Sequence, residues 1–486
     1  MKNKNKFQTI IADCINLNSL DKFSELIDCT KNTSNYFFLV KNHFNSEGFI
    51  VRHVFDYLSD ILDKGLKFVN IIVVPQSTDG NPLNNNSLYI LWMVNDFSAM
   101  RFDKDSIREK HIWKDVEWGK REKNYNPKGK DPGNFWLPTE DDGKGKITFH
   151  KILSLEEILV RLVNSTCLDN DQVAIISNEV FDKIELKTIP KIKLEYYSAA
   201  LHQRVKTNTT RNIKLEKKDI KFATKGKSNV YFKSSEKMKE IQDETINLMV
   251  TSPPYWDLKN YFKEGQIGQE SYQEYLDRMN SVWSETYRVL KPEGSMWINI
   301  NTRAKNKKPI LIPHDIIKQC TQLGFYLKDI IIWHKSSGIP THKNNLVDRY
   351  EFFLWFTKTK KYSVNSDIAL RINDYKNDNL VSGLTWNLNR KAGSVGKDFV
   401  HPAIYPKELI ARIIELCTQE GEMVLDPFLG SGTTLIAARN TKRNCIGYEF
   451  NEGFESLIKY RIENEIDEKD SVKFHYSKKM NETIFR

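Results

Sequence analysis

The sequence predicts an α/β protein with a doubly wound, largely parallel sheet, preceded by a degenerate second copy of the same fold. Two observations lead to this fold class. Strand-like runs alternate with helix-like segments across residues 229–486, and parts of residues 1–195 match them in the same order. Such alternation is typical of strands joined by helices that cover both faces of a sheet. Ligands of these sheets bind beyond the carboxyl ends of the strands.

Six short apolar runs bounded by turn residues are expected to form the strands of the complete sheet. Between them, residues 271–291 and 406–419 carry apolar side chains at helical spacing, the pattern of a helix with one buried face. The six predicted strands are residues 247–252, 295–300, 326–335, 350–358, 422–428 and 444–450.

Three segments of the N-terminal half line up with this pattern, which indicates an internal duplication. Any one match is weak, because apolar strands resemble each other, but the three occur in the same order. In this alignment Ile175 falls opposite Asp426, and nothing in residues 1–34 resembles the proline-rich segment described below. The N-terminal copy is therefore expected to keep the scaffold without the chemistry. The matches pair residues 65–76 with 324–335, 88–96 with 350–358, and 154–176 with 405–427.

We expect three parts along the chain. Residues 1–195, the N-terminal copy, are expected to serve recognition or to form half of a pseudo-dimer, and residues 229–486, the C-terminal copy, are expected to carry the chemistry. Residues 196–228 form a basic linker; its stretch 202–228 holds nine Lys and Arg against two acids and is either a solvated connection or a phosphate-contacting strap. The basic and aromatic segment 113–136 is either a nucleic-acid surface or a structural loop.

Composition favours a nucleic-acid-binding or enzymatic protein of the cytoplasm. The formal charge is +10 and the pI about 9.0, an excess that suits a polyanionic partner. The six cysteines include no CxxC pair, so neither a metal site nor a disulfide framework is expected. The start of the chain lacks a signal-peptide pattern, and no apolar run reaches the ~18 residues of a membrane span.

Residues 422–440 combine a strand, an acid, a glycine-containing loop and a helix in that order. Gly430 and Gly432 allow the backbone to approach a ligand, and the helix start offers N–H groups. Glu449 ends the following strand 23 residues after Asp426, a spacing that suits the hydroxyls of a ribose. The loop lacks the Lys of a triphosphate-binding P-loop. The structural alternatives are a helix cap for Asp426 and a surface acid for Glu449.

The segment "NLMVTSPPYWDLKNY", residues 247–261, ends a strand in two prolines. Because proline fixes φ, the carbonyls of Ser252 and Pro253 point in set directions and can accept hydrogen bonds from an –NH₂ group. Tyr255 offers a face on which a planar base can stack. Alone, the segment could also be a proline turn that closes a strand. We call residues 252–255 the tip.

Together, "TSPPYW" (251–256), "HPAIYP" (401–406) and "DPFLGSGTT" (426–434) resemble the amino-group DNA methyltransferases that use S-adenosylmethionine, in their β permutation. The resemblance covers roughly residues 229–465 and implies a Rossmann-like methyltransferase sheet. It implies that Ser252, Pro253, Pro254 and Tyr255 hold the target amine. It also implies cofactor binding by Asp426, Phe428, Gly430, Ser431, Gly432, Thr433, Thr434, Glu449, Phe450, His401 and Pro402.

Two departures from the family pattern affect the expected contacts. Members often carry an acid near the start of the unit before the tip, whereas this chain reads "VYFKSSEKMKEI" at 230–241 without that Asp. The region that reads DNA sequence commonly precedes the HP motif, but residues 360–400 leave only a short insert there. Sequence reading is therefore expected in the N-terminal copy.

The resemblance implies methyl transfer from S-adenosylmethionine to an exocyclic amine of a flipped base in double-stranded DNA. Hydrogen bonds from the amine to the Pro253 carbonyl and to Ser252 localise its lone pair for direct displacement. The chain contains no Pro-Cys dipeptide, which disfavours carbon-5 methylation.

Ser at the first tip position is associated in the family with cytosine N4, and Asp or Asn with adenine N6, so N4-cytosine is preferred and N6-adenine is the alternative. RNA or protein methylation and a non-catalytic DNA-binding module are further alternatives. A cognate restriction endonuclease is an expected partner, and the chain is expected to act as a monomer with an internal pseudo-dimer or as a homodimer.

Overall fold

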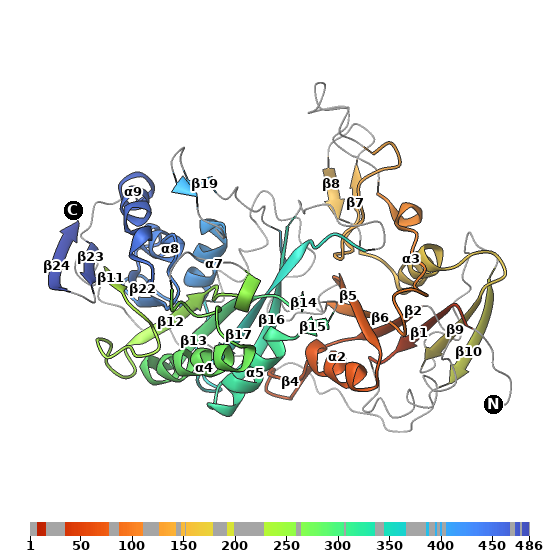
Figure 1. Ribbon diagram of the computed structural model, residues 1–486, viewed down its shortest axis with the longest axis horizontal. Coiled ribbons are helices and arrows are strands. Elements are labelled where there is room, and N and C mark those ends of the chain that lie inside the picture. The colour runs from red at the N-terminus through yellow and green to blue at the C-terminus, as the bar shows by residue number, and fades with distance from the viewer. Residues whose placement is uncertain are drawn as a thin grey trace.

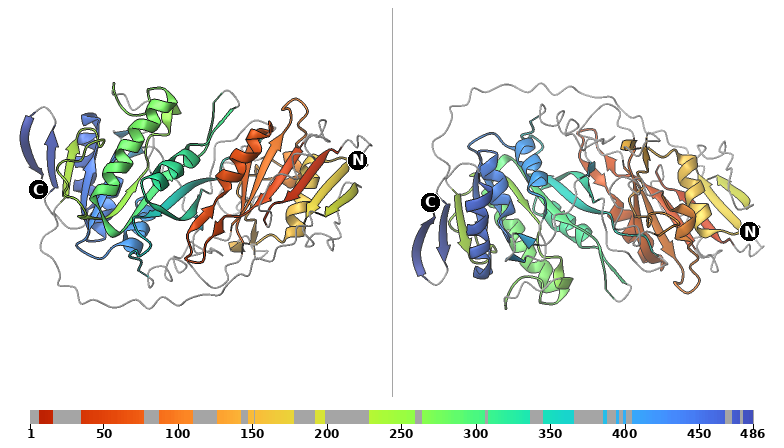
Figure 2. Two further views of the ribbon diagram at one scale, coloured as in Figure 1. Left: turned by 90° about the horizontal axis from the view of Figure 1, so that it is seen from below. Right: turned by 90° about the horizontal axis from the view of Figure 1, so that it is seen from above.

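The computed structural model contains two α/β units that lie side by side along the longest axis of the molecule (Figures 1 and 2). The N-terminal copy is drawn in red to yellow and the C-terminal copy in green to blue. The structure describes residues 7–15, 35–76, 87–109, 126–141, 147–150, 152–177, 192–198, 228–258, 264–305, 308–335, 345–365, 385–387, 394–395, 399–400, 405–466, 472–476 and 479–485.

The C-terminal copy is built on a ten-stranded sheet in the order β18-β16-β17-β13-β12-β21-β22-β11-β23-β24. The strands from β13 to β23 in this order run parallel, whereas β17 is antiparallel to both of its neighbours. All six predicted strands are present. The strands are β11 (Ser228–Phe232), β12 (Ile246–Thr251), β13 (Leu290–Ile300), β16 (Tyr326–His334), β17 (Tyr350–Thr357), β18 (Thr385–Asn387), β21 (Met423–Asp426), β22 (Asn444–Tyr448), β23 (Val472–Tyr476) and β24 (Lys479–Phe485).

Helices cover both faces of this sheet, as the sequence predicts. Alternate residues of β12 face opposite sides: Met249 packs with the helices α4 and α5, and Leu248 and Val250 pack with α7, α8 and α9. Ser271 starts α4 with a capping box, since its hydroxyl accepts from the Glu274 N–H. The helices are α4 (Tyr272–Val289), α5 (Ile312–Gln322), α7 (Lys407–Cys417), α8 (Thr433–Asn440) and α9 (Glu455–Glu465), with the 3-10 turns η3 (Trp256–Leu258) and η5 (Glu452–Phe454).

The N-terminal copy repeats the central part of this sheet strand for strand. Its order, β5-β6-β2-β1-β9-β10, corresponds to β16-β17-β13-β12-β21-β22, and every pair of neighbours has the same relative direction. The predicted degenerate copy is therefore confirmed. Its elements are β1 (Thr9–Asp13), β2 (Asn35–Val40), α2 (Val54–Asp63), β5 (Lys67–Val74), β6 (Leu88–Val94), η1 (Lys104–Ile107), α3 (Leu155–Thr166), β9 (Gln172–Ser177) and β10 (Lys193–Ser198).

Strand register refines the alignment between the copies. The antiparallel pairs β5–β6 and β16–β17 carry a β-bulge at the same place, between Phe68 and Asn70 and between Leu327 and Asp329. With the bulges aligned, Trp92 matches Trp355, so the predicted pairing of 88–96 with 350–358 is wrong by one residue. A gap-free comparison of apolar strands cannot detect such a slip, because only the ladder fixes which residue faces which side.

The same register places the positions that carry chemistry in the C-terminal copy. Thr9 pairs with Val173 in the N-terminal copy, and Leu248 pairs with Val424 at the equivalent place in the C-terminal copy. Ile175 lies two residues after Val173, and Asp426 lies two residues after Val424. Ile175 therefore occupies the position of Asp426, as the sequence predicted. It also places Asp13 at the register position of Ser252.

A buried tryptophan also recurs in the two copies. Trp386 of β18 lies beside β16, and Trp136 lies beside the equivalent strand, where Phe135 bridges to Val73. Phe135 and Trp136 are buried, so this end of segment 113–136 is structural and not a nucleic-acid surface. Residues 113–125 of that segment lie outside the described residues.

The two copies contact each other through equivalent elements. Helix α2 contacts its counterpart α5, while β4 contacts β16 and, reciprocally, β15 contacts β5 (Figure 1). Such exchange of equivalent contacts is the mark of an isologous, two-fold interface. The small strand pairs are β3 (His43–Phe44) with β4 (Ile50–Arg52), β7 (Thr139–Asp141) with β8 (Ile147–His150), β14 (Arg303–Lys305) with β15 (Lys308–Ile310), and β19 (Ser394–Val395) with β20 (Phe399–Val400).

The first domain extends three residues beyond the predicted boundary, because β10 ends at Ser198. The central part of the predicted linker, residues 199–227, lies outside the described residues.

Candidate active site

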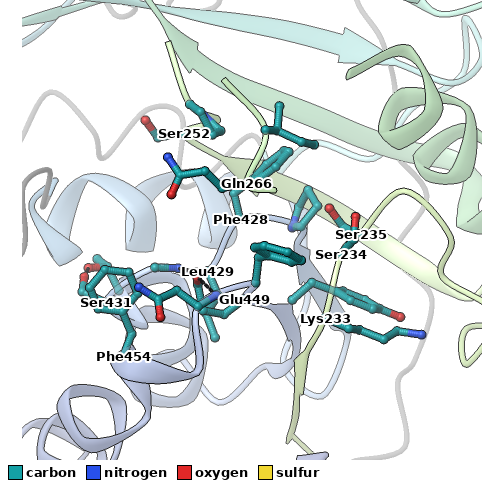
Figure 3. Close-up of a pocket in the computed structure, with 18 of the residues that line it drawn as sticks. Lys233, Ser234, Ser235, Ser252, Gln266, Phe428, Leu429, Ser431, Glu449 and Phe454 are labelled. Atoms are coloured by element: carbon teal, nitrogen blue, oxygen red, sulfur yellow. Dashed lines mark hydrogen bonds between the residues drawn. The ribbon is translucent and has the colours of Figure 1, made fainter. Parts of the chain in front are cut away.

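A cavity opens at the carboxyl ends of β11, β12, β21 and β22, and its space together with the open solvent at its mouth amounts to about 900 Å³. In Figure 3, Ser252 and Gln266 lie on one side of it, and Ser431, Glu449 and Phe454 lie on the other. The residues that line it are Lys233, Ser234, Ser235, Ser252, Pro254, Gln266, Ile267, Arg278, Tyr405, Pro427, Phe428, Leu429, Gly430, Ser431, Thr433, Tyr448, Glu449, Phe450, Asn451 and Phe454.

Asp426 does not line the cavity but lies fully buried beneath it. Its carboxylate accepts hydrogen bonds from the hydroxyls of Thr251 (2.6 Å) and Thr434 (2.5 Å) and from the backbone N–H of Phe428 (3.0 Å). Burial raises the pKa of Asp426, and these donors oppose the shift. Asp426 therefore ties the loop of residues 427–432 to the strand that carries the tip. Because the sequence predicts that this loop binds the cofactor, we call it the cofactor loop.

Glu449 lines the cavity and holds the far side of the loop. Its carboxylate accepts from the backbone N–H groups of Gly430 and Asn451, each at 2.7 Å. Desolvation raises the pKa of Glu449 to about 7, and the two backbone donors oppose the shift. A carboxylate held in this way presents its remaining lone pairs to hydroxyls of a ligand in the cavity.

The loop before α8 has the conformation that its glycines predict. Gly430 and Gly432 have positive φ values of 53° and 83°, and Gly432 is the N-cap of α8. The buried Arg461 donates to the Ser431 carbonyl and hydroxyl and to the Thr433 hydroxyl, so it fixes the loop from behind.

The tip is held rigidly at the end of β12. Ser252 and Pro254 line the cavity, whereas Pro253 is buried. Tyr275 of α4 donates to the Pro254 carbonyl at 2.8 Å, and the Trp256 indole donates to the Glu270 carbonyl at 2.9 Å. The Pro254 carbonyl is thus bonded within the protein.

Tyr255 does not line this cavity. Its hydroxyl bonds to Asn299 of β13 at 3.2 Å and to Glu351 of β17 at 3.0 Å, so the ring stands beside the cavity, anchored on two neighbouring strands. Glu351 in turn accepts from Lys335 at 2.7 Å. Neither Glu351 nor Lys335 was expected from the sequence, because only the fold brings these strand ends to the tip.

Two expected cofactor residues, His401 and Pro402, lie outside the described residues. Tyr405 of the same motif lines the cavity and shares a 2.9 Å hydrogen bond with Thr434. Sequence reasoning did not predict that Lys233, Ser234 and Ser235 form one wall of the cavity. A signal was present, because the family pattern often places an acid in this stretch. Sequence reasoning also missed Gln266 and Arg278, for which the sequence offers no motif.

The site suits a nucleoside-bearing cofactor with a charged tail. Phe428 and Phe450 supply apolar rings, Glu449 supplies an acceptor for hydroxyls, and the loop presents backbone groups without a P-loop lysine.

Within the described residues, no cluster of His, Cys, Asp and Glu could hold a metal ion. A helix long and apolar enough to cross a membrane is likewise absent from the described part of the chain. The fold and the cavity at its carboxyl edge are those expected of a nucleoside-binding α/β protein.

Comparison with known proteins identifies the family. The DNA methylase family model for N6 and N4 methyltransferases matches residues 246–460. The type II methyltransferase M.MthZI of Methanothermobacter thermautotrophicus is 34% identical over 275 residues, which cover 48% of this chain and 76% of that protein. M.Cfr9I of Citrobacter freundii is 31% identical over 264 residues, covering 47% and 85%. The chain belongs to the amino-group DNA methyltransferases, acts on DNA and uses S-adenosylmethionine.

Solved structures also match about half of the chain. A DNA modification methylase of Thermus thermophilus is 25% identical with a TM-score of 0.39, covering 51% of this chain and 99% of that one. The PvuII DNA methyltransferase, described as cytosine-N4-specific, is 22% identical with a TM-score of 0.41, covering 50% and 90%.

Proposed function

We propose that this chain methylates the N4 amine of a flipped cytosine in a specific site of duplex DNA. The observation that carries the choice of base is Ser252 at the first tip position, the residue that the family associates with cytosine. Ser252 lines the cavity on the side opposite Glu449 (Figure 3).

In this proposal the cofactor lies in the cavity and supplies an electrophilic methyl group. Glu449 holds its ribose hydroxyls, while Phe428, Phe450 and the loop residues Gly430, Ser431 and Thr433 surround the remainder. Asp426, Gly432 and Thr434 act from beneath by fixing the loop, and His401 and Pro402 stay predictions from the motif.

The tip then prepares the target amine. The two N–H groups of the amine would donate to the Pro253 carbonyl and to the Ser252 hydroxyl, which would remove the amine lone pair from conjugation and direct it toward the methyl carbon. The methyl–sulfur bond of the cofactor would break as the bond from nitrogen to the methyl carbon forms, and the surplus proton of the amine would leave to solvent. No strong base is required, since the amine becomes acidic only as the new C–N bond forms. Tyr255 stacks on the extruded ring and keeps it in line.

Nucleoside analysis tests the choice of base. Mixed duplex DNA is incubated with the protein and labelled cofactor, digested and separated. N4-methylcytosine is the expected product, whereas N6-methyladenine would replace this proposal with the adenine alternative. Label in RNA or protein and not in DNA would overturn both. Ser252→Ala should abolish product with cofactor affinity intact, while Asp426→Ala should abolish product through lost cofactor binding.

We further propose that the N-terminal copy forms an internal pseudo-dimer with the C-terminal copy and reads DNA sequence, so that the chain acts as a monomer. The isologous contacts of α2 with α5 support this, as does the isoleucine at the position of Asp426. A fragment of residues 196–486 that remained folded and methylated its site at the normal rate would refute the idea.

The type II names of the relatives support a restriction–modification role with a cognate endonuclease. The cysteines of the described residues, Cys14, Cys167, Cys320, Cys417 and Cys445, are buried free thiols, which supports a reducing, cytoplasmic setting.

A further inference from the structure

The segment between β6 and α3 of the N-terminal copy pairs with the residues just before β17 in the C-terminal copy. Gly133 forms a parallel bridge with Val347, in which the Val347 N–H donates to the Pro132 carbonyl and the Asn134 N–H donates to the Val347 carbonyl. A Cβ at Gly133 would lie 2.2 Å from Cγ of Arg349, so the Arg349 side chain occupies the space that a larger residue would need.

The buried side chain of Asn134 lies at the centre of this contact between the two copies. Its amide donates to Asp348 and to Asn70, each at 3.0 Å, and its carbonyl oxygen accepts the Arg349 backbone N–H at 2.9 Å. The side chain therefore fixes the backbone at Arg349 directly, through a bond that is shielded from water.

From Arg349 a continuous series of hydrogen bonds runs to the tip. The Arg349 carbonyl accepts the Lys335 backbone N–H at 2.6 Å. The Lys335 ammonium donates to one oxygen of Glu351 at 2.7 Å, and the other oxygen accepts the Tyr255 hydroxyl at 3.0 Å. Both side chains of the Lys335–Glu351 pair are largely buried, at 7% and 13% exposure, so their geometry is set by their partners and not by solvent.

We propose that Asn134 of the N-terminal copy is a positioning residue for Tyr255 of the tip. It acts by holding the Lys335–Glu351 pair in the geometry that anchors the tyrosine hydroxyl. A degenerate copy that has lost its own chemistry thereby completes the site of its partner. This inference rests on the proposed contact of Tyr255 with the target base, and it holds for either amine.

If Asn134 positions Tyr255, changing Asn134 should lower the methyl-transfer rate only in a protein that still has the Tyr255 hydroxyl. Asn134→Ala should lower the single-turnover methyl-transfer rate at least about tenfold, because small misplacements of a reacting group are costly, while cofactor affinity stays unchanged. In a Tyr255→Phe background, which keeps the ring and removes the hydroxyl, Asn134→Ala should cost less than about twofold more. Glu351→Gln should show the same dependence on Tyr255.

Matched variants separate this link from general loosening of the interface. Glu47→Gln removes the Lys360–Glu47 ion pair, an exposed contact between the same two copies, and should leave the rate unchanged. If Asn134→Ala does not fold, Asn134→Leu replaces it, since leucine has a similar shape and lacks both the acceptor for Arg349 and the donors toward Asp348 and Asn70.

Equal losses from the Asn134 change in the natural background and in the Tyr255→Phe background, or an unchanged rate, would overturn the inference. Failure of the proposed choice of base is seen separately, in the identity of the product of the unaltered protein.

Discussion

Thr251, the last residue of β12, donates a 2.6 Å hydrogen bond to Asp426, the last residue of β21. Both side chains are fully buried. Since the tip begins at the next residue after Thr251 and the cofactor loop begins directly after Asp426, this hydrogen bond ties the tip to the loop at the ends of two paired strands.

Thr251→Val removes this donor while it preserves the shape of the side chain. The Asp426 carboxylate then lacks one partner in a buried position, which should destabilise the protein by about 1–3 kcal/mol. Cofactor affinity should fall with it, because the loop loses its anchor. Urea unfolding and cofactor titration measure the two effects. Thr245→Val, whose exposed hydroxyl bonds only to a turn carbonyl, is the control and should change neither.

Cofactor binding should strengthen as the pH rises through about 7. Desolvation raises the pKa of Glu449 to about 7 in the free protein, so at pH 6 the group is largely protonated. Ribose hydroxyls donate to the carboxylate form, and binding therefore favours deprotonation. Titrations between pH 6 and pH 8 should show this gain for the natural protein, whereas Glu449→Gln should bind weakly with no pH dependence. A flat profile for the natural protein would contradict the assigned role.

The same carboxyl group should affect the stability of the free protein in the opposite direction. Its folded pKa lies above the ordinary value of 4.5, so its contribution to stability is complete below pH 4.5 and is lost as the pH rises through 7. Without cofactor, the stability of Glu449→Gln relative to the natural protein should rise by an amount on the order of 2 kcal/mol between pH 5 and pH 8. The hydrogen bond that the Gln amide cannot accept costs the variant the same at both pH values, so it cancels in this comparison. Urea unfolding at the two pH values measures the rise.

Local sequence patterns were sufficient for six of the ten strands of the C-terminal sheet, for helix α4 and for the cofactor loop. Each depends on neighbours along the chain: apolar periodicity, the Ser271 cap, and glycines at 430 and 432 where positive φ is needed. The duplication was also predictable, because the order of apolar segments survives the loss of individual motif residues.

Contacts between distant segments were not predictable in this way. The inward orientation of Asp426 depends on hydroxyls supplied by Thr251 and Thr434 from other elements. The one-residue slip at Trp92 is decided by ladder register, and the path from Asn134 to Tyr255 joins two copies of the fold. Each requires knowledge of which strands are neighbours, which apolar patterns alone do not specify.

Gly447 of β22 leaves room for the side chain of Leu429 in the cofactor loop. A Cβ at this position would lie 2.6 Å from a methyl of Leu429. Gly447→Ala should therefore displace Leu429, destabilise the protein by about 1–3 kcal/mol and weaken cofactor binding. If the cause is this collision, adding Leu429→Ala should recover part of the affinity. Simple addition of the two losses would indicate another cause.

Tyr275 tests whether rigidity of the tip, apart from its composition, contributes to methyl transfer. Its fully buried ring packs in the core, and its hydroxyl donates to the Pro254 carbonyl at 2.8 Å. Tyr275→Phe keeps the ring and frees the carbonyl, so the stability should fall by only about 1 kcal/mol. The methyl-transfer rate should fall about tenfold at unchanged cofactor affinity, because the neighbouring carbonyls that hold the amine lose their fixed direction.

Tyr272→Phe on the same helix removes a 2.6 Å hydrogen bond to Asp315 and keeps its ring against Trp256. It should cost similar stability without loss of rate, and equal rate losses in the two variants would show that the tip does not depend on Tyr275.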